Sequence, residues 1–231
     1  MRVPSSGKAF ATVLVALAAF AAPATPAASA DDPLEPLNRN ILFVNGAFDR
    51  AVVRPVASGY ARIVPAPIRA GIGNFLDNLR EPRTAINQLL QGRPDLAVAD
   101  TARFLVNSTL GIGGLFDPAA HMGLAHHRED FGQTFAVWGI EPGPYLMIPF
   151  VGSSNVRDAI GTVVGFGAMP QTYIDLPPRA ALTAMWVIRQ RSENLHLDAE
   201  ITGDPYVYLR EAWMKRRAAE IAETGEGASA P

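Results

Sequence analysis

The sequence of 231 residues contains no cysteine. This absence excludes disulfides, metal sites with thiolate ligands and a thiol nucleophile. Charged residues are also scarce, at 18%, and the formal net charge of -2 provides no basic excess of the kind that neutralises nucleic-acid phosphates. Since 48% of the residues are hydrophobic, the chain is too apolar for a disordered protein. We therefore expect a folded domain that does not bind nucleic acid.

Recognisable catalytic motifs are missing as well. The segment Gly152-Ser153-Ser154-Asn155-Val156 departs from the nucleophile elbow of hydrolases at its fifth position. Gly71-Ile72-Gly73 and Gly111-Ile112-Gly113 lack the third glycine of a dinucleotide-binding loop. The sequence therefore predicts no enzyme and no cofactor.

One cluster of imidazoles and carboxylates is a candidate metal site. Its members are His121, His126, His127, Glu129 and Asp130. Such groups bind divalent metals, but the spacing of a helical zinc site is absent and adjacent histidines point to different sides of a helix. A solvated polar loop is the favoured interpretation, and we predict no metal. A metal-dependent hydrolase built on this cluster stays open as an alternative.

The first thirty residues have the features of a cleavable signal peptide. Arg2 and Lys8 give a positive start, and residues 9–22 form an uncharged apolar run. This run is shorter than the roughly 20 residues of a membrane-spanning helix. Ala28-Ser29-Ala30 matches a small-residue cleavage site, so we expect export and a mature chain that begins near Asp31. An uncleaved anchor is the alternative.

The rest of the chain has the pattern of helices joined by glycine and proline turns, with no internal repeat. We predict a single all-α domain over residues 31–223 and a disordered tail over 224–231, where glycine and alanine are frequent. The expected helices cover residues 32–50, 65–79, 81–91, 94–110, 130–138, 155–167, 178–195 and 205–223. Gly161 and Gly165 have the spacing of closely packed helices, but this spacing is often incidental.

The first helix is expected to start with Asp32 as its N-cap, Pro33 at its first position and Glu35 completing a capping box. Its apolar residues cover much of its circumference, whereas Asn38 and Asn45 form a narrow polar line. Two interpretations remain open. The asparagines are either bonded inside a buried core helix, or they face a wet cavity beside apolar surroundings.

A short β-hairpin is predicted near residues 137–150. The segment Glu141-Pro142-Gly143-Pro144 consists of residues that favour a turn. It lies between an apolar pair at residues 137–138 and an apolar run at residues 145–148. These patterns alone describe an exported helical protein with much apolar surface. They fit a protein in a membrane interface as well as an ordinary periplasmic domain.

An ordered set of short motifs resembles the MlaA (VacJ) family of outer-membrane phospholipid-transport proteins. The set spans nearly all of the mature chain, and although each motif is weak alone, their order is specific. The matching segments are Asp32-Pro33-Leu34-Glu35, Val53-Arg54-Pro55-Val56, Asn78-Leu79-Arg80-Glu81-Pro82, Leu90-Gln91-Gly92, Asn107-Ser108-Thr109, Gly111-Ile112-Gly113-Gly114, Glu129-Asp130-Phe131-Gly132-Gln133-Thr134, Gly143-Pro144-Tyr145-Leu146, Arg157-Asp158 and Asp204-Pro205-Tyr206.

The resemblance implies a ring of helices that lies in the periplasmic leaflet of the outer membrane and encloses an amphipathic channel. Such a protein removes mislocalised phospholipids from the outer leaflet and passes them to a soluble periplasmic carrier, and it binds a trimeric porin. It breaks no chemical bond. A soluble periplasmic lipid-binding module is the alternative function.

We predict a lipid channel lined by residues that offer a polar path and apolar company, namely Asn38, Leu42, Phe43, Asn45, Arg103 and Arg157. Either arginine is expected to meet a lipid phosphate or to form a structural ion pair. Gly143, Pro144 and Tyr145 resemble the loop that gates the channel in the family.

The chain departs from the family pattern at three places. Pro36-Leu37 stands where Gly-Phe is usual, and Val44 stands where an aromatic residue is usual. Family members are also acylated on a cysteine after the signal sequence, and this chain has none. We therefore expect a protein that is not lipidated and that is held at the membrane by its own apolar faces or by a partner.

Overall fold

The computed structural model describes residues 32–228, and the expected signal peptide lies outside them. The described chain is helical apart from one two-stranded sheet, which confirms the predicted fold class. Its elements are α2 (Glu35–Phe48), the π-helical turn η1 (Asp49–Val53), α3 (Arg54–Ile63), α4 (Ala66–Asn78), α5 (Glu81–Leu90), α6 (Pro94–Thr109), α7 (Pro118–His121), α8 (Phe131–Val137), β1 (Tyr145–Ile148), β2 (Gly152–Asn155), α9 (Val156–Gly167), η2 (Pro170–Tyr173), α10 (Leu176–Glu193), η3 (Leu195–Ala199) and α11 (Pro205–Ala228).

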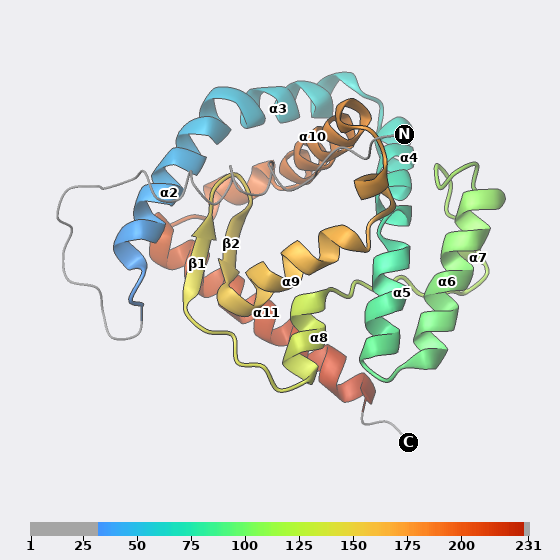
Figure 1. Ribbon diagram of the computed structural model, residues 1–231. Helices are drawn as coiled ribbons and strands as arrows, with labels where there is room; N and C mark the ends of the chain where they lie inside the picture. The colour runs from blue at the N-terminus through green and yellow to red at the C-terminus, as the bar shows by residue number, and fades with distance from the viewer. Residues whose placement is uncertain (1–31, 229–231) are drawn as a thin grey trace, which may run out of the picture.

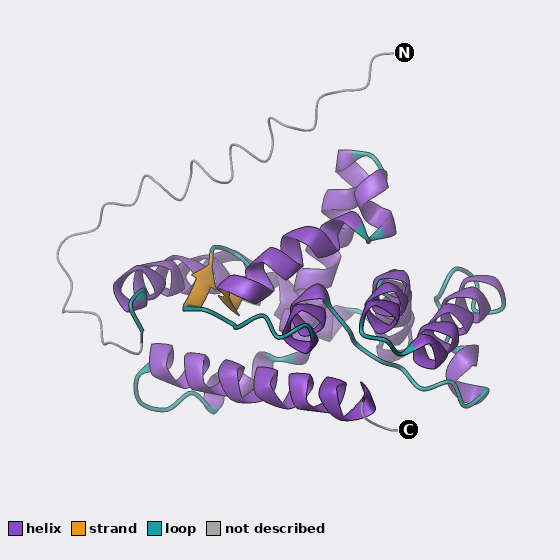
Figure 2. Cartoon of the chain, turned by 60° about the horizontal axis from the view of Figure 1, so that its bottom comes forward, coloured by secondary structure: helices purple, strands orange, loops and turns teal. Residues whose placement is uncertain are grey.

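The helices follow one another around a ring. In Figure 1, α2 and α3 form the upper arc, α4 and α5 descend on the right, and α8 and α11 close the outline below. The hairpin and α9 lie within this outline, whereas α6 and α7 pack on its outer right side. Helix α8 contacts both α9 and α11, and α10 contacts α3 and α4. Figure 2 shows α11 as a long straight helix that runs beneath the other elements.

The upper arc is one continuous, bent helical path. The sequence predicted that the first helix ends near Arg50, but α2 passes through the π-helical turn η1 directly into α3. Such π-turns bend a helix without ending it. Asp49 in this turn accepts two hydrogen bonds from the Arg191 guanidinium, at 2.8 and 3.0 Å, so α10 braces the bend.

The start of α2 differs from the predicted capping box. The helix begins at Glu35, and its cap residue Leu34 makes no side-chain cap. The Asp32 carboxylate is buried instead, where it accepts a 2.5 Å hydrogen bond from the Tyr206 hydroxyl and lies 3.1 Å from Arg210. The Asp32 side chain, which the local sequence predicted to cap α2, thus contacts α11 instead.

The predicted hairpin exists, but its position is shifted along the chain. Strands β1 and β2 pair antiparallel, with Tyr145 opposite Asn155 and Ile148 opposite Gly152. The turn therefore lies at residues 149–151, where Phe150 adopts a left-handed φ of 61°. Val137 cannot form the first strand because it is the last residue of α8.

Two helices approach closely where glycines replace larger residues. A Cβ added to Gly161 of α9 would lie 2.5 Å from the backbone nitrogen of Gly132 in α8. A Cβ at Gly132 would in turn lie 2.4 Å from an Asp158 oxygen and 2.6 Å from the Arg217 guanidinium. The spacing of Gly161 and Gly165, interpreted as incidental from the sequence, thus marks a real close contact.

The C-terminal helix continues beyond the predicted start of a disordered tail at residue 224. Helix α11 runs to Ala228. Its Thr224 is buried against α8 and the loop before it. The Thr224 hydroxyl accepts a 3.1 Å hydrogen bond from Gln133 and donates to Glu129 at 3.3 Å. These tertiary contacts outweigh the glycine-rich local composition. Among residues 32–228, no helix combines the length and apolarity needed to cross a membrane.

Candidate functional site

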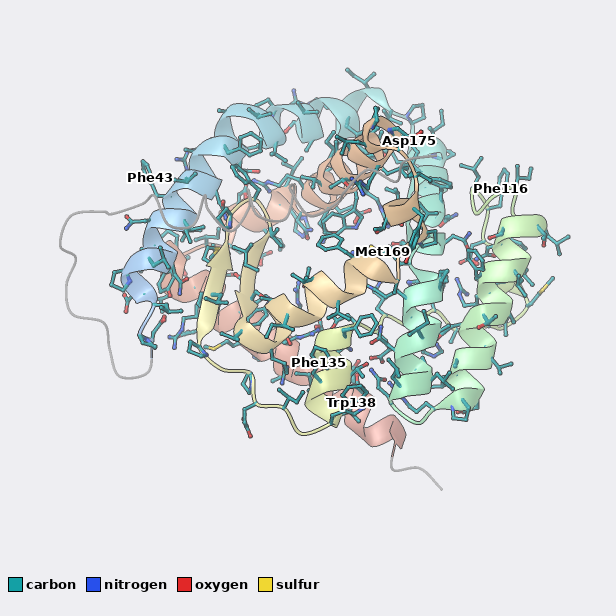
Figure 3. All side chains as sticks on the ribbon, viewed as in Figure 1. Phe43, Phe116, Phe135, Trp138, Met169 and Asp175 are labelled. Atoms are coloured by element: carbon teal, nitrogen blue, oxygen red, sulfur yellow. The ribbon has the colours of Figure 1, made fainter. Side chains whose placement is uncertain are left out.

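The distribution of polar and apolar residues is the reverse of that in an ordinary soluble domain. Among the buried described residues, polar and charged ones outnumber apolar ones, and many large apolar side chains are exposed. Phe43, Phe116 and Trp138 are 72%, 60% and 53% exposed, and they lie at the left, right and lower parts of the view in Figure 3. Large contiguous apolar surfaces mark contacts with membranes or partners. The candidate functional surface is therefore the exposed apolar surface, to which Phe43, Phe116 and Trp138 contribute around the ring.

A buried ion network holds α8, α9 and α11 together. Arg217 of α11 contacts Asp158 at 2.8 Å and Asp130 at 2.7 Å, while Arg157 contacts the other Asp158 oxygen at 2.9 Å. Burial alone would raise the pKa of Asp130, but hydrogen bonds and charge from Arg217 more than reverse this and lower it. Such charge-assisted bonds are strong when every charge has a partner.

A second network links α5, α6 and the loop before α8. Arg103 contacts Glu81 at 3.2 Å and Asp117 at 2.9 Å, and it also donates to the Leu124 carbonyl. Some of these groups line a cavity of about 210 Å³, whose lining residues are Asn74, Asp77, Asn78, Glu81, Arg103, Asn107, Asp117 and His126. Arg103 thus borders a polar cavity, but two carboxylates already compensate its charge.

Arg103 and Arg157 follow the second of the two interpretations that the sequence offered, a structural ion pair rather than a phosphate contact. Both side chains are buried in ion pairs, which is the structural alternative that the sequence left open. Arg157 also donates to the Ile140 carbonyl at 3.3 Å. Several donors of each guanidinium are thus directed at protein oxygens.

The adjacent histidines His126 and His127 of the candidate metal cluster contact different carboxylates. His126 lies 3.0 Å from Glu81 and His127 lies 2.7 Å from Asp100. Glu129 pairs instead with Arg93, at 3.0 Å. His126, His127 and Glu129 thus have partners on α5, on α6 and at the start of α6, whereas Asp130 pairs with Arg217 of α11.

Asn38 is fully buried, with 0% of its surface exposed. Its amide nitrogen donates to the Tyr145 carbonyl at 3.0 Å and to the Tyr206 hydroxyl at 3.3 Å. Its amide oxygen accepts from the Met147 backbone N–H at 2.8 Å. Both ends of the side chain are therefore used inside the protein, which corrects the prediction that Asn38 faces a wet channel.

Asn45 makes the same pair of contacts further along strand β1. It donates to the Ile148 carbonyl at 3.0 Å and accepts from the Phe150 N–H at 2.8 Å. Seven residues of helix rise about 10 Å, which equals about three residues of an extended strand. The polar line on α2 therefore matches the repeat of β1 and fastens the hairpin to the helix. A channel-lining role of the half-buried Asn45 stays a prediction.

The two apolar residues of the predicted channel separate. Leu42 packs against the small core cluster of Tyr145, Met147 and Tyr206. Phe43 points away from the ring in Figure 3 and belongs to the exposed apolar exterior. The structure thus brings Leu42 to the same cluster as Asn38 and places Phe43 apart from it.

The segment predicted to gate the channel is tied down at its C-terminal side. Gly143 has a left-handed φ of 66°, and Tyr145 is buried. The Pro144 carbonyl accepts a hydrogen bond from Val156 at 3.3 Å. A gating role of Gly143, Pro144 and Tyr145 stays a prediction.

Sequence reasoning missed two arginines at the α4–α5 junction. The Arg80 guanidinium lies 4.7 Å from the centre of the Trp186 ring on α10. Burial, together with the charge of Arg83, lowers the pKa of Arg80 to about 10, and burial also lowers the pKa of Arg83. Both lie in or beside the Asn78–Pro82 motif, where adjacent positive charge was the only signal that could have drawn attention to them.

Comparisons with known proteins agree with this architecture. A model of the family described as "MlaA lipoprotein" matches residues 30–220. An uncharacterised protein of Rickettsia conorii is 37% identical over 82% of this chain and 78% of its own length. The "Intermembrane phospholipid transport system lipoprotein MlaA" of Escherichia coli is 34% identical over 84% of this chain and 80% of its own.

A solved structure is similar over most of the fold. It is described as "Structural basis for maintenance of bacterial outer membrane lipid asymmetry" and has 34% sequence identity and a TM-score of 0.74. The match covers 82% of this chain and 98% of that one. The chain therefore belongs to the MlaA lipoprotein family.

Proposed function

We propose that this protein transports phospholipids at the outer membrane and so maintains the lipid asymmetry of that membrane. The observation that carries the proposal is the reversed distribution of residues, with polar groups buried between helices and large apolar side chains exposed around the ring. Such a surface is stable against lipid acyl chains and costly against water.

The names of the relatives support the same function. The Escherichia coli relative is named for intermembrane phospholipid transport, and the similar solved structure concerns outer-membrane lipid asymmetry. We propose further that the ring lies in the periplasmic leaflet and removes mislocalised phospholipids from the outer leaflet. A soluble periplasmic carrier then receives the lipid, and a trimeric porin holds the protein in place.

Attachment to the membrane is proposed to rest on the apolar exterior. The chain has no cysteine that could carry the acyl anchor of a lipoprotein. Burial of a single large apolar side chain contributes about 1.5–3 kcal/mol, so several exposed side chains together replace such an anchor. Phe43 on α2 and Phe116 before α7 are among the residues available for this contact.

Deletion of the gene in its own bacterium tests the proposal. We expect phospholipids to accumulate in the outer leaflet, measured by a membrane-impermeant label of exposed headgroups, and we expect the wild-type gene to restore the original distribution. The protein should sediment with outer-membrane vesicles after a high-salt wash. An unchanged outer leaflet would contradict the transport function, and release into the soluble periplasm would favour a soluble lipid-binding module.

A further inference from the structure

Arg80 and Arg83 differ from the arginines around them because they lack a carboxylate partner. Arg103, Arg189 and Arg217 contact carboxylates at 3.2, 2.9 and 2.7 Å. Within residues 32–228, neither Arg80 nor Arg83 forms an ion pair within 4.0 Å. The Nε atom of Arg83 is moreover buried without a hydrogen-bond partner.

Both side chains are directed toward the inner elements of the ring. Arg80 stacks on Trp186 of α10, and Arg83 runs beside α9, where a Cβ added to Gly165 would lie 3.5 Å from its Cδ atom. Arg80 is the N-cap residue of α5, and Arg83 lies in the first turn of that helix. Helix α6 packs on α5 from the outer side of the ring (Figure 1). The two guanidinium groups therefore occupy the inner face of the α4–α5 junction.

The surrounding charges leave this pair uncompensated. The nearby carboxylate of Asp77 is engaged by Arg189, and that of Asp130 is engaged by Arg217. Two half-buried like charges disfavour each other, and an anion between them would remove this penalty. A guanidinium presents a planar fork of donors that fits the oxygens of a phosphate.

The neighbouring helix α9 presents an apolar surface beside the two arginines. Helix α9, which Arg83 touches and which lies within the ring outline in Figure 1, exposes five large apolar side chains. They are Val156, Ile160, Val163, Val164 and Phe166. A cationic pair beside an exposed apolar helix matches the two halves of an amphipathic ligand better than it matches a free inorganic ion.

We propose that Arg80 and Arg83 bind the phosphate of a glycerophospholipid headgroup on the inner side of the ring, while the exposed side chains of α9 contact its acyl chains. This inference rests on the proposed function, because it names the part of the lipid that the protein recognises. Trp186 positions the Arg80 guanidinium through its ring face.

A binding comparison between two lipids tests the proposal. The purified full chain in nonionic detergent is titrated with dioleoyl phosphatidylglycerol and with dioleoylglycerol, which has the same acyl chains but no phosphate. We expect the wild type to bind the phospholipid at least about tenfold more tightly, and the double variant Arg80→Gln/Arg83→Gln to lose this preference. The matched control Arg62→Gln removes a charge from an exposed arginine at the end of α3 and should keep it.

Thermal unfolding without lipid separates a binding role from a structural one. Removing two mutually repelling charges should leave the Tm of the double variant equal to or above that of the wild type, whereas a lowered Tm would overturn the proposal. Retained preference in the double variant would also overturn it. The variant Arg83→Lys keeps the positive charge but lacks the planar set of guanidinium donors. It should therefore lose part of the preference for phosphatidylglycerol over dioleoylglycerol.

Two further outcomes distinguish this inference from the proposed function. If inorganic phosphate at millimolar concentration raises the Tm as much as phosphatidylglycerol does, the pair binds free phosphate and the inference is overturned. Equal binding of both lipids by the wild type would overturn the inference alone. Binding of neither lipid would overturn the proposed transport function as well.

Discussion

The helix–helix contacts of this protein and its outer surface are made from opposite kinds of residues. Helices α8, α9 and α11 meet through Arg217, Asp158 and Asp130, whereas the exterior carries residues such as Phe43 and Phe116. Between lipid-solvated helices the hydrophobic effect supplies little attraction, so polar contacts and close packing hold such helices together. Cohesion between the helices and attachment to the membrane therefore depend on different residues, so that each property can be changed without the other.

The largest effect on cohesion is expected from Arg217→Met. This change leaves Asp158 and Asp130 without their shared partner, and breaking a buried ion pair costs about 3–5 kcal/mol. We expect the free energy of unfolding to fall by about this amount, measured by urea titration in nonionic detergent with far-UV circular dichroism.

The adjacent residue provides the control for this change. The Arg216 side chain is 68% exposed and forms an ion pair with Glu220, one turn away, at 3.3 Å. Exposed pairs of this kind contribute about 0–1 kcal/mol. If Arg216→Met destabilised the protein as much as Arg217→Met, the polar contacts between helices would not be the source of cohesion.

A smaller loss of stability is expected from Asn38→Leu. The change leaves the Tyr145 carbonyl and the Met147 N–H buried without partners, at a cost of about 1–3 kcal/mol for each group. We expect a fall in unfolding free energy of about 2–4 kcal/mol and faster hydrogen exchange in strand β1. Asn45→Leu should cost less, since its contacts are only partly buried and water can replace them. Equal effects of the two changes would contradict a difference based on burial.

Local signals predicted most of the helices correctly, because each such signal acts within a few residues. Helix α8 begins after Asp130 and α6 begins at Pro94, both as expected, and in α8 a capping box of Asp130 and Gln133 fixes this start. The start of the predicted tail was placed too early, because α11 extends past Thr224 and that residue is bonded to Gln133, which is 91 residues away. Composition reports local preference and cannot report such a contact.

The candidate site was harder to predict than the fold for the same reason. The spacing of Asn38 and Asn45 showed that they share a face, but their partner strand begins more than one hundred residues later, at Tyr145. Whether an arginine is paired is also a long-range property. Arg103 is paired with Glu81, 22 residues away, whereas Arg83 has no such partner, and the nearby Arg80 was the only local sign of this difference.

The smallest effect on stability, and the clearest effect on membrane attachment, is expected from the double variant Phe43→Asp/Phe116→Asp. Both side chains are exposed, so the unfolding free energy should change by no more than about 0.5 kcal/mol for each change. Each phenylalanine nevertheless contributes about 1.5–3 kcal/mol when lipid covers it. The fraction of protein that floats with phospholipid vesicles should therefore fall at least about tenfold. Leu76→Ala provides the opposite control, because Leu76 is buried and its truncation should lower stability by about 2–5 kcal/mol without changing flotation of the folded protein. If the aspartates unfolded the protein, or if flotation did not change, the apolar exterior would not be the membrane-attaching surface.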